Sequence, residues 1–412
     1  TVVFNDTKSV KEAFKLVALS DRAPITHFKE GTKGKGFGFT NYVNAEQKFF
    51  IIKNLKIYNE NGQYLEGKLN DEISYFFDTL NPGTPIPIRN LFSHTVVNSI
   101  WGIVMGYTFK HDDPQVRILC DLAQRVTAIQ GMAEAIGMFN PWLSNLMPNF
   151  TGVTSWVTAY KNLCDFVEGK ANERKQTRVK GQPRDMTDAY FDREENTNDP
   201  ASTFFPGKNF LPNSMAEMLV GALNTTSTSL EWMILYLAKY QEVQRKLQQE
   251  ISEVASKTGL PALSDRPNMP YTEAVIHEVL RITGLLPMAL SHYTNVDAEV
   301  MGYFIPKDTL LVQNTWGIQH DPEVWDAPEE FRPERFLDDS GTRFQKNENL
   351  VVFGPGKRSC VGESVSKDQL FLFVTRMFQR FSVQYSGKPP SEQGKHGMVL
   401  HTEPFNAIFT LL

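Results

Sequence analysis

The residues with the most distinctive chemistry surround Cys360, in the segment Phe353-Gly-Pro-Gly-Lys-Arg-Ser-Cys-Val-Gly-Glu363. Two glycines and a proline direct the backbone along an unusual path just before a predicted helix. A helix N-terminus and the backbone N–H groups of a glycine-rich turn lower the pKa of a thiol, and Arg358 adds positive charge nearby. A thiolate in this setting can serve as a nucleophile, a redox sensor or a metal ligand. The alternative is a structural cysteine buried in a turn.

The remaining residues narrow the role of this thiol. A nucleophile requires a base, and the motif contains no histidine. A zinc site requires further cysteine or histidine ligands at short spacing, which Cys120 and Cys164 do not provide. A metal whose other ligands belong to a cofactor is therefore the chemical interpretation that remains, and haem iron is the common case.

Composition excludes several classes of protein. The 412 residues include 42 basic and 47 acidic ones, a formal charge of −5, so no basic excess is present to neutralise the phosphates of a nucleic acid. Three scattered cysteines cannot build a disulfide framework. No run of 18 apolar residues and no signal peptide occurs in the chain. The 41% of hydrophobic residues is typical of a globular protein.

The pattern of apolar residues predicts a mainly helical body. From about 70 to 250, apolar residues recur at intervals of three and four, which is the helical period. After residue 282, short β-like runs alternate with proline-rich coil. The segment 361–381 has the pattern of a last helix, and residues 397–412 are predicted to form a hairpin. No linker divides the chain, so we expect one large unit with small β-sheets.

Four motifs in order resemble the cytochrome P450 superfamily of the animal microsomal type. The first is Phe353-x-x-Gly356-x-Arg358-x-Cys360-x-Gly362, which resembles the haem-binding signature of that family. Glu278-Val-Leu-Arg281 resembles its Glu-x-x-Arg helix, and residues 325–336 resemble the coil that adds a second arginine, here Arg335. Residues 221–226, Gly-Ala-Leu-Asn-Thr-Thr, resemble its oxygen-activating stretch.

The resemblance implies a fold and a cofactor. The expected fold is mainly α with small β-sheets (α+β), the P450 fold, as a single haem-enclosing domain over residues 1–412. The family's membrane anchor, first strand and first helix would fall before residue 1. Haem b would bind through the Cys360 thiolate as axial iron ligand. The resemblance assigns cofactor-binding positions in a set of six: Cys360, Phe353, Gly356, Arg358, His292 and Lys48.

Three of the positions in that set, Arg358, His292 and Lys48, carry more specific expectations. Arg358 and His292 are expected to bind the haem carboxylates. The family's Trp-x-x-x-Arg would fall on Asn44 and Lys48, so the tryptophan donor is lost and lysine replaces a forked guanidinium with a point charge.

The remaining positions concern catalysis, stability and substrate. Thr225 and the residue before it would deliver protons to dioxygen, but that residue is Asn224, an amide that cannot titrate. The hydroxyl of Thr225 is expected to bond a carbonyl three or four residues back. Glu278, Arg281 and Arg335 are expected to form a buried structural ion triad. Four apolar residues match positions that line the substrate pocket, namely Ala222, Leu286, Leu290 and Val399.

The function implied is a haem-thiolate monooxygenase. It would insert one atom of dioxygen into a lipophilic small molecule such as a lipid, steroid, terpenoid or xenobiotic. An NADPH-dependent flavoprotein reductase would supply the electrons, because no dinucleotide-binding fingerprint occurs here. The resemblance places such enzymes on the cytoplasmic face of the endoplasmic reticulum membrane, held by a segment that this sequence does not contain. Asn224 keeps a reductase-independent isomerase or peroxygenase acting on lipid peroxides in view, and a non-catalytic haem-binding sensor is the third hypothesis.

Overall fold

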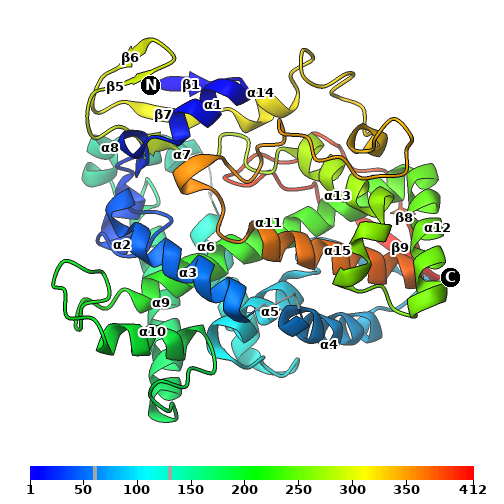
Figure 1. The fold of residues 1–412 in the computed structure, drawn as a ribbon, viewed down its shortest axis with the longest axis horizontal. Coiled ribbons are helices and arrows are strands. Elements are labelled where there is room, and N and C mark those ends of the chain that lie inside the picture. Colours follow the sequence, from blue (N-terminus) through cyan, green and yellow to red (C-terminus); the bar gives the residue numbers. More distant parts are fainter. Residues whose placement is uncertain (59–62, 129–131) are drawn as a thin grey trace.

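The computed structural model describes residues 1–58, 63–128 and 132–412, and helices dominate it (Figure 1). The helices of the N-terminal half are α1 (Thr7–Phe14), α2 (Thr26–Thr32), α3 (Ala45–Tyr58), α4 (Gln63–Thr79), α5 (Ser93–Met105), α6 (Pro114–Thr127), α7 (Met132–Phe139), α8 (Pro141–Leu146), α9 (Val153–Gln176) and α10 (Met186–Glu195). Those that follow are α11 (Leu211–Lys239), α12 (Gln241–Thr258), α13 (Pro270–Thr283), α14 (Thr315–Gln319) and α15 (Glu363–Arg380).

In the described part of the chain, nine short strands form three small sheets. The first sheet has the order β1 (Val2–Phe4), β7 (Leu310–Gln313), β4 (His292–Tyr293), β2 (Asp21–Arg22). The second has the order β3 (Pro85–Pro87), β9 (Asn406–Leu411), β8 (Phe381–Ser386), and the third pairs β5 (Ala298–Val300) with β6 (Tyr303–Ile305). The first sheet joins the N-terminal segment to residues 292–313, because β1 runs parallel to β7 and β2 pairs antiparallel with β4.

The long helix α11 forms the centre of the molecule. It runs through the middle of Figure 1 with α15 alongside it, and it also contacts α5, α6, α9 and α13. Its residues are buried on nearly every side from Leu211 to Ala238, and the buried side chains include polar ones such as Glu217, Asn224 and Glu231. Gly221 is the exception, since it is exposed in the middle of this buried helix.

The closing segment differs from the expectation that 397–412 forms a hairpin on its own. Strand β9 pairs with β8, and residues 387–405 separate the two strands. The reason is that α15 ends at Arg380 and the chain continues directly into β8, which supplies β9 with a partner six residues long. Among the described residues, no helix is both long and apolar enough to cross a membrane.

Candidate functional site

The Cys360 thiol lies just before the start of α15. The backbone N–H of Cys360 donates to the Phe353 carbonyl at 2.8 Å, and α15 begins three residues later at Glu363. The side chain is exposed, yet burial by the surrounding protein raises the pKa of its thiol. The thiol is thus accessible to a ligand although protein surrounds it.

The raised pKa corrects the sequence-based expectation of a lowered one. The N–H groups of Gly362 and Glu363 at the start of α15 do lower the pKa of the thiol, as expected, but burial outweighs them. The cation that acts on the thiol is Lys48 rather than the adjacent Arg358. A metal ion would remove this penalty, because a coordinating thiol is deprotonated outright.

Gly356 allows the Cys360 loop to pack against the N-terminal part of the chain. Its φ is +74°, in the left-handed region, and a Cβ added there would lie 2.0 Å from the carbonyl oxygen of Phe14. Both observations require glycine, since L residues pay steric strain at this φ and the Phe14 backbone cannot move aside cheaply.

We expect Gly356→Ala to lower both the stability and the haem content of the purified protein. The φ strain costs about 1–2 kcal/mol, and the contact with Phe14 adds to it by displacing the loop. Gly354→Ala is the control, because Gly354 has a φ of +70° but a Cβ there meets nothing within 4 Å. Equal losses in the two variants, measured by urea unfolding and by the haem-to-protein ratio, would contradict a role for the Phe14 contact.

Four basic side chains converge beside the Cys360 loop. Burial is the leading cause that lowers the pKa of all four, and positive neighbours lower the pKa of three of them further. The pKa values of Arg22, Lys48 and Arg358 fall to about 9, 8 and 10, and that of His292 falls well below its ordinary value. Neighbouring cations contribute to the shifts of Arg22, Lys48 and His292, and burial is the leading cause for Arg358. Such a cluster favours an anionic ligand.

The predicted residues of this cluster make contacts within the protein. Arg358 donates to three carbonyl oxygens, those of Ser20 at 2.7 Å, Phe37 at 2.6 Å and Thr40 at 2.6 Å. One ring nitrogen of His292, Nδ1, lies 3.0 Å from the Leu19 carbonyl, and the ring stacks on Phe14 with centroids 3.8 Å apart. The structure thus places both residues in the cluster, and their contact with haem carboxylates stays a prediction.

Arg22 is a member of this cluster that the sequence analysis missed. It lies on β2 directly opposite His292 on β4, and it donates to the carbonyl oxygens of Gly38 and Leu290, both at 2.8 Å. Its membership of the cluster depends on the pairing of β2 with β4, in which residues 270 positions apart lie opposite each other. An arginine in the short run Ser20-Asp21-Arg22 carries no local signal beyond its charge.

The predicted oxygen-activating residues lie on α11. The Thr225 hydroxyl donates to the Gly221 carbonyl at 2.6 Å, four residues back, as expected. Asn224 is buried, and its amide nitrogen lies 3.5 Å from the Val220 carbonyl. A hydroxyl pair joins this part of α11 to the helix that follows Cys360, because Thr226 Oγ1 and Ser366 Oγ are 3.2 Å apart.

These features together fit a haem. The thiol offers a soft ligand, the basic cluster offers partners for two carboxylates, and a Cβ on Gly221 would meet nothing within 4 Å. The last observation means that a flat ligand can approach the backbone of α11 closely. The ligand atom, the positive charge and the open backbone of α11 are therefore all suited to a haem.

Glu217 was not identified from the sequence, although it lies on α11 two turns before Thr225. One carboxylate oxygen accepts the backbone N–H groups of Phe37 and Gly38, both at 2.7 Å, and the other accepts the Tyr160 hydroxyl at 3.3 Å. These bonds hold the glycine-rich segment of residues 31–38 (Gly-Thr-Lys-Gly-Lys-Gly-Phe-Gly) against α11. The same segment supplies the Phe37 carbonyl that accepts a hydrogen bond from Arg358. Burial raises the pKa of Glu217 to about 7 despite these donors.

This shift predicts a pH dependence of stability. The folded protein holds the Glu217 proton more tightly than the unfolded chain, whose carboxyl titrates at its ordinary value of 4.5. Stability therefore falls as the pH rises from 4.5 to about 7, by about 3 kcal/mol for a shift of this size. Glu217→Gln should flatten the urea-unfolding profile across this window. The control Glu299→Gln alters an exposed carboxyl and should leave the profile unchanged; superimposable profiles for Glu217→Gln and wild type would contradict the assignment.

The structure brings the three triad residues together. Arg281 binds Glu278 through two bonds, from Nε to Oε2 at 2.7 Å and from a terminal nitrogen to Oε1 at 2.9 Å. Arg335 Nε donates to the same Oε1 at 2.9 Å, and so does the backbone N–H of Arg332. Glu278 and Arg281 are both fully buried. The structure thus places the three residues in one buried ion cluster, and their structural role stays a prediction.

The predicted substrate-lining residues come from three segments. The Leu400 N–H donates to the Leu285 carbonyl at 2.8 Å, which brings the stretch with Val399 beside the stretch with Leu286. Ala222 and Leu286 are half-buried at the edge of the core, and Leu290 is held near the basic cluster by Arg22. The structure thus places these apolar residues on segments next to the site, and their contact with substrate stays a prediction.

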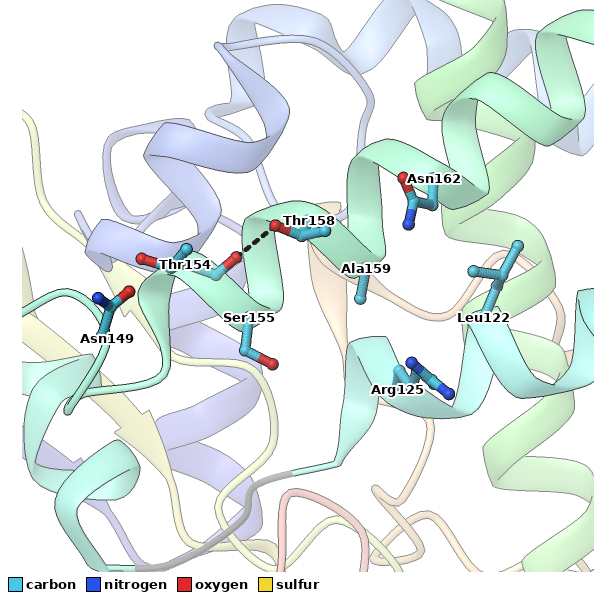
Figure 2. A pocket seen from close by; sticks show the side chains of 8 residues that line it. All are labelled: Leu122, Arg125, Asn149, Thr154, Ser155, Thr158, Ala159 and Asn162. Atoms are coloured by element: carbon cyan, nitrogen blue, oxygen red, sulfur yellow. Dashed lines mark hydrogen bonds between the residues drawn. The ribbon is translucent and has the colours of Figure 1, made fainter.

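A separate hollow of about 360 Å³ lies between α6 and α9 (Figure 2). Its wall carries hydroxyl and amide groups and one guanidinium, contributed by Leu122, Arg125, Asn149, Thr154, Ser155, Thr158, Ala159 and Asn162. The Thr158 hydroxyl bonds the Thr154 carbonyl at 2.8 Å within α9. None of the site residues predicted from the sequence lines this hollow.

Comparison with known proteins finds relatives that match most of the chain. The chain is 34% identical to Cytochrome P450 2L1 of Panulirus argus over 407 residues, covering 96% of this chain and 80% of that protein. It is 32% identical to the Vitamin D(3) 25-hydroxylase of Sus scrofa, covering 98% and 82%, and 32% identical to the Farnesoate epoxidase of Bombyx mori, covering 87% and 73%.

A solved structure and a family model extend the agreement to the fold. A zebra fish cytochrome P450, in a structure with progesterone, superposes with a TM-score of 0.88 at 26% identity, covering all of this chain and 93% of that one. The model of the family "Cytochrome P450" matches residues 1–409. The protein whose thiol, basic cluster and central helix are described above therefore belongs to the cytochrome P450 family of haem-thiolate monooxygenases.

Proposed function

We propose that this protein inserts one atom of dioxygen into a lipophilic small molecule, with Cys360 as the axial ligand of the haem iron. The observation that carries the proposal is the Cys360 thiol, accessible yet desolvated, at the start of α15 and beside four basic side chains. When bound, the haem supplies the activation of dioxygen and the oxidation itself.

Two side chains on α11, Thr225 and Asn224, are placed to take part in proton delivery. The Thr225 hydroxyl donates a hydrogen bond to the Gly221 carbonyl, so its oxygen remains available to accept a hydrogen bond from water or from substrate. Asn224 can anchor a water molecule but cannot release a proton, so water would carry protons to this part of α11, held there by a hydrogen bond to Thr225 Oγ1. The basic cluster of Arg22, Arg358 and His292 would orient the cofactor through its carboxylates.

The substrate class follows from the apolar residues and from the relatives. Ala222, Leu286, Leu290 and Val399 would exclude water and hold a lipophilic molecule above the cofactor. The relatives are named for a vitamin D hydroxylation and a farnesoate epoxidation, and the solved neighbour was studied with progesterone. Steroids and terpenoids are therefore the first molecules to screen.

Electrons would come from an NADPH-dependent flavoprotein reductase at the cytoplasmic face of the endoplasmic reticulum membrane. The relatives named above support this assignment, because the chain aligns with animal P450 enzymes along nearly its whole length. Asn224 supports a second candidate, a reductase-independent enzyme that rearranges lipid peroxides, since such chemistry needs no proton from the residue before Thr225.

The test has two parts. The reduced, carbon-monoxide-bound holoenzyme should show the strongly red-shifted Soret band of a thiolate ligand, and a histidine-like band would refute Cys360 ligation. Turnover of a steroid and terpenoid panel should then require NADPH and reductase. Turnover with a lipid hydroperoxide alone, and none with reductase, would establish the second candidate instead.

A further inference from the structure

Lys48 contacts the Cys360 loop. It lies on α3, its side chain is buried, and its Nζ donates to the carbonyl oxygens of Lys357 at 2.8 Å and Ser359 at 2.6 Å. Both hydrogen-bond acceptors belong to the loop that delivers Cys360. These partners differ from the one expected from the sequence, which was a haem carboxylate.

We infer that Lys48 is a positioning residue for the thiolate, which clamps the loop before Cys360 and places a positive charge beside it. This inference rests on the proposed function, because it takes Cys360 as the iron ligand. It assigns the Lys48 ammonium to the thiolate side of the cofactor and leaves the haem carboxylates to the other members of the basic cluster.

The bonding of one peptide group shows how the clamp works. The carbonyl of the Ser359–Cys360 peptide accepts a hydrogen bond from Lys48, and its N–H donates to the Phe353 carbonyl at 2.8 Å. The peptide group is therefore held on both sides. A cation on the carbonyl polarises the peptide and strengthens the bond from its N–H. Arg358, between the two acceptors of Lys48, points its guanidinium at Ser20, Phe37 and Thr40 instead. Lys48 is thus placed to act on the sulfur.

The charge has a definite consequence for the reduction of the iron. A positive charge near the thiolate favours the state with one more electron, so it raises the reduction potential. It also draws electron density from the sulfur and weakens its donation to the iron. A lysine that bound a haem carboxylate would act on the other end of the cofactor and leave the bond between iron and sulfur unchanged.

The experiment is a potentiometric titration of the substrate-free holoenzyme in three variants. Lys48→Met should reduce the equilibrium constant for one-electron reduction about tenfold, which corresponds to a potential about 59 mV more negative. Lys48→Arg keeps the charge and should stay near wild type. Lys53→Met removes an equal charge from an exposed position on the same helix and should change nothing. Equal potentials for wild type and Lys48→Met would overturn the inference.

Resonance Raman spectra of the same samples identify the partner of Lys48. We expect the iron–sulfur stretching band to shift in Lys48→Met while the bending bands of the haem carboxylates stay in place. A shift of the carboxylate bands alone would overturn the inference and return Lys48 to the carboxylates.

Loss of haem in Lys48→Met, and a negative result for Lys48, can both be told apart from failure of the proposed function. If Lys48→Met does not retain haem, a crystal structure of the wild-type holoenzyme decides: Nζ bonded to the Lys357 and Ser359 carbonyls supports the inference, and Nζ on a haem carboxylate overturns it. A red-shifted Soret band in wild type confirms the thiolate in either case, so a negative result for Lys48 leaves Cys360 as the ligand.

Discussion

Cys360→Ala is expected to abolish both the red-shifted Soret band of the reduced, carbon-monoxide-bound protein and the oxidation of any substrate. Alanine removes the sulfur but leaves the loop intact, because the bond that fixes this residue runs from its backbone N–H to the Phe353 carbonyl. The loss is therefore chemical rather than structural. Activity should fall to that of free haem, measured as product formed per NADPH consumed.

Cys164→Ala is the matched control. Cys164 is also a free cysteine, but it lies on α9, and burial raises the pKa of its thiol to about 12. Its removal should leave the spectrum and the turnover unchanged. A red-shifted band that survives in Cys360→Ala would refute the assignment of the ligand, and with it the site built around this residue.

The second large effect is on folding. Arg281→Met should destabilise the holoenzyme by about 3–5 kcal/mol, because it leaves the Glu278 carboxylate fully buried with one arginine instead of two. The carbonyl oxygen of Gln319 also loses its Arg281 donor, whereas that of Glu330 keeps Arg335 as a donor. Urea unfolding monitored by far-ultraviolet circular dichroism measures the loss.

Arg332→Met tests whether the effect depends on burial. The Arg332 side chain pairs with Asp326 at the surface, where an ion pair contributes about 0–1 kcal/mol. Its backbone N–H continues to serve Glu278 after the substitution. A loss in Arg332→Met as large as that in Arg281→Met would show that the buried pairs are not what stabilises this region.

Local motifs predicted the parts of the site that depend on neighbours in sequence. The hydrogen bond from Thr225 to Gly221 and the pairing of Glu278 with Arg281 are both contacts within one turn of a helix, so spacing is sufficient to expect them. The mainly helical fold with small sheets was also expected, and the P450 family confirms it.

The remaining parts depend on contacts between distant segments. Arg22 joins the basic cluster because β2 pairs with β4, and Glu217 bonds a loop 180 residues earlier in the chain. The sign of the pKa shift at Cys360 was wrong in the sequence analysis for a related reason. Helix-start donors can be read from sequence, whereas the burial that outweighs them comes from the whole fold.

The span of the contacts around the Cys360 loop constrains the biosynthesis of the protein. Lys48 and Ser359 are 311 residues apart, and Arg358 and Ser20 are 338 residues apart. A ribosome that adds about 5–20 residues per second needs roughly 15–60 s to cover that distance. During that interval α3 and residues 31–38 lack the contacts with the Cys360 loop that bury their polar groups. Capture of the cofactor is therefore a late event that requires the Cys360 loop to have been synthesised, and chaperones have the same roughly 15–60 s in which to act.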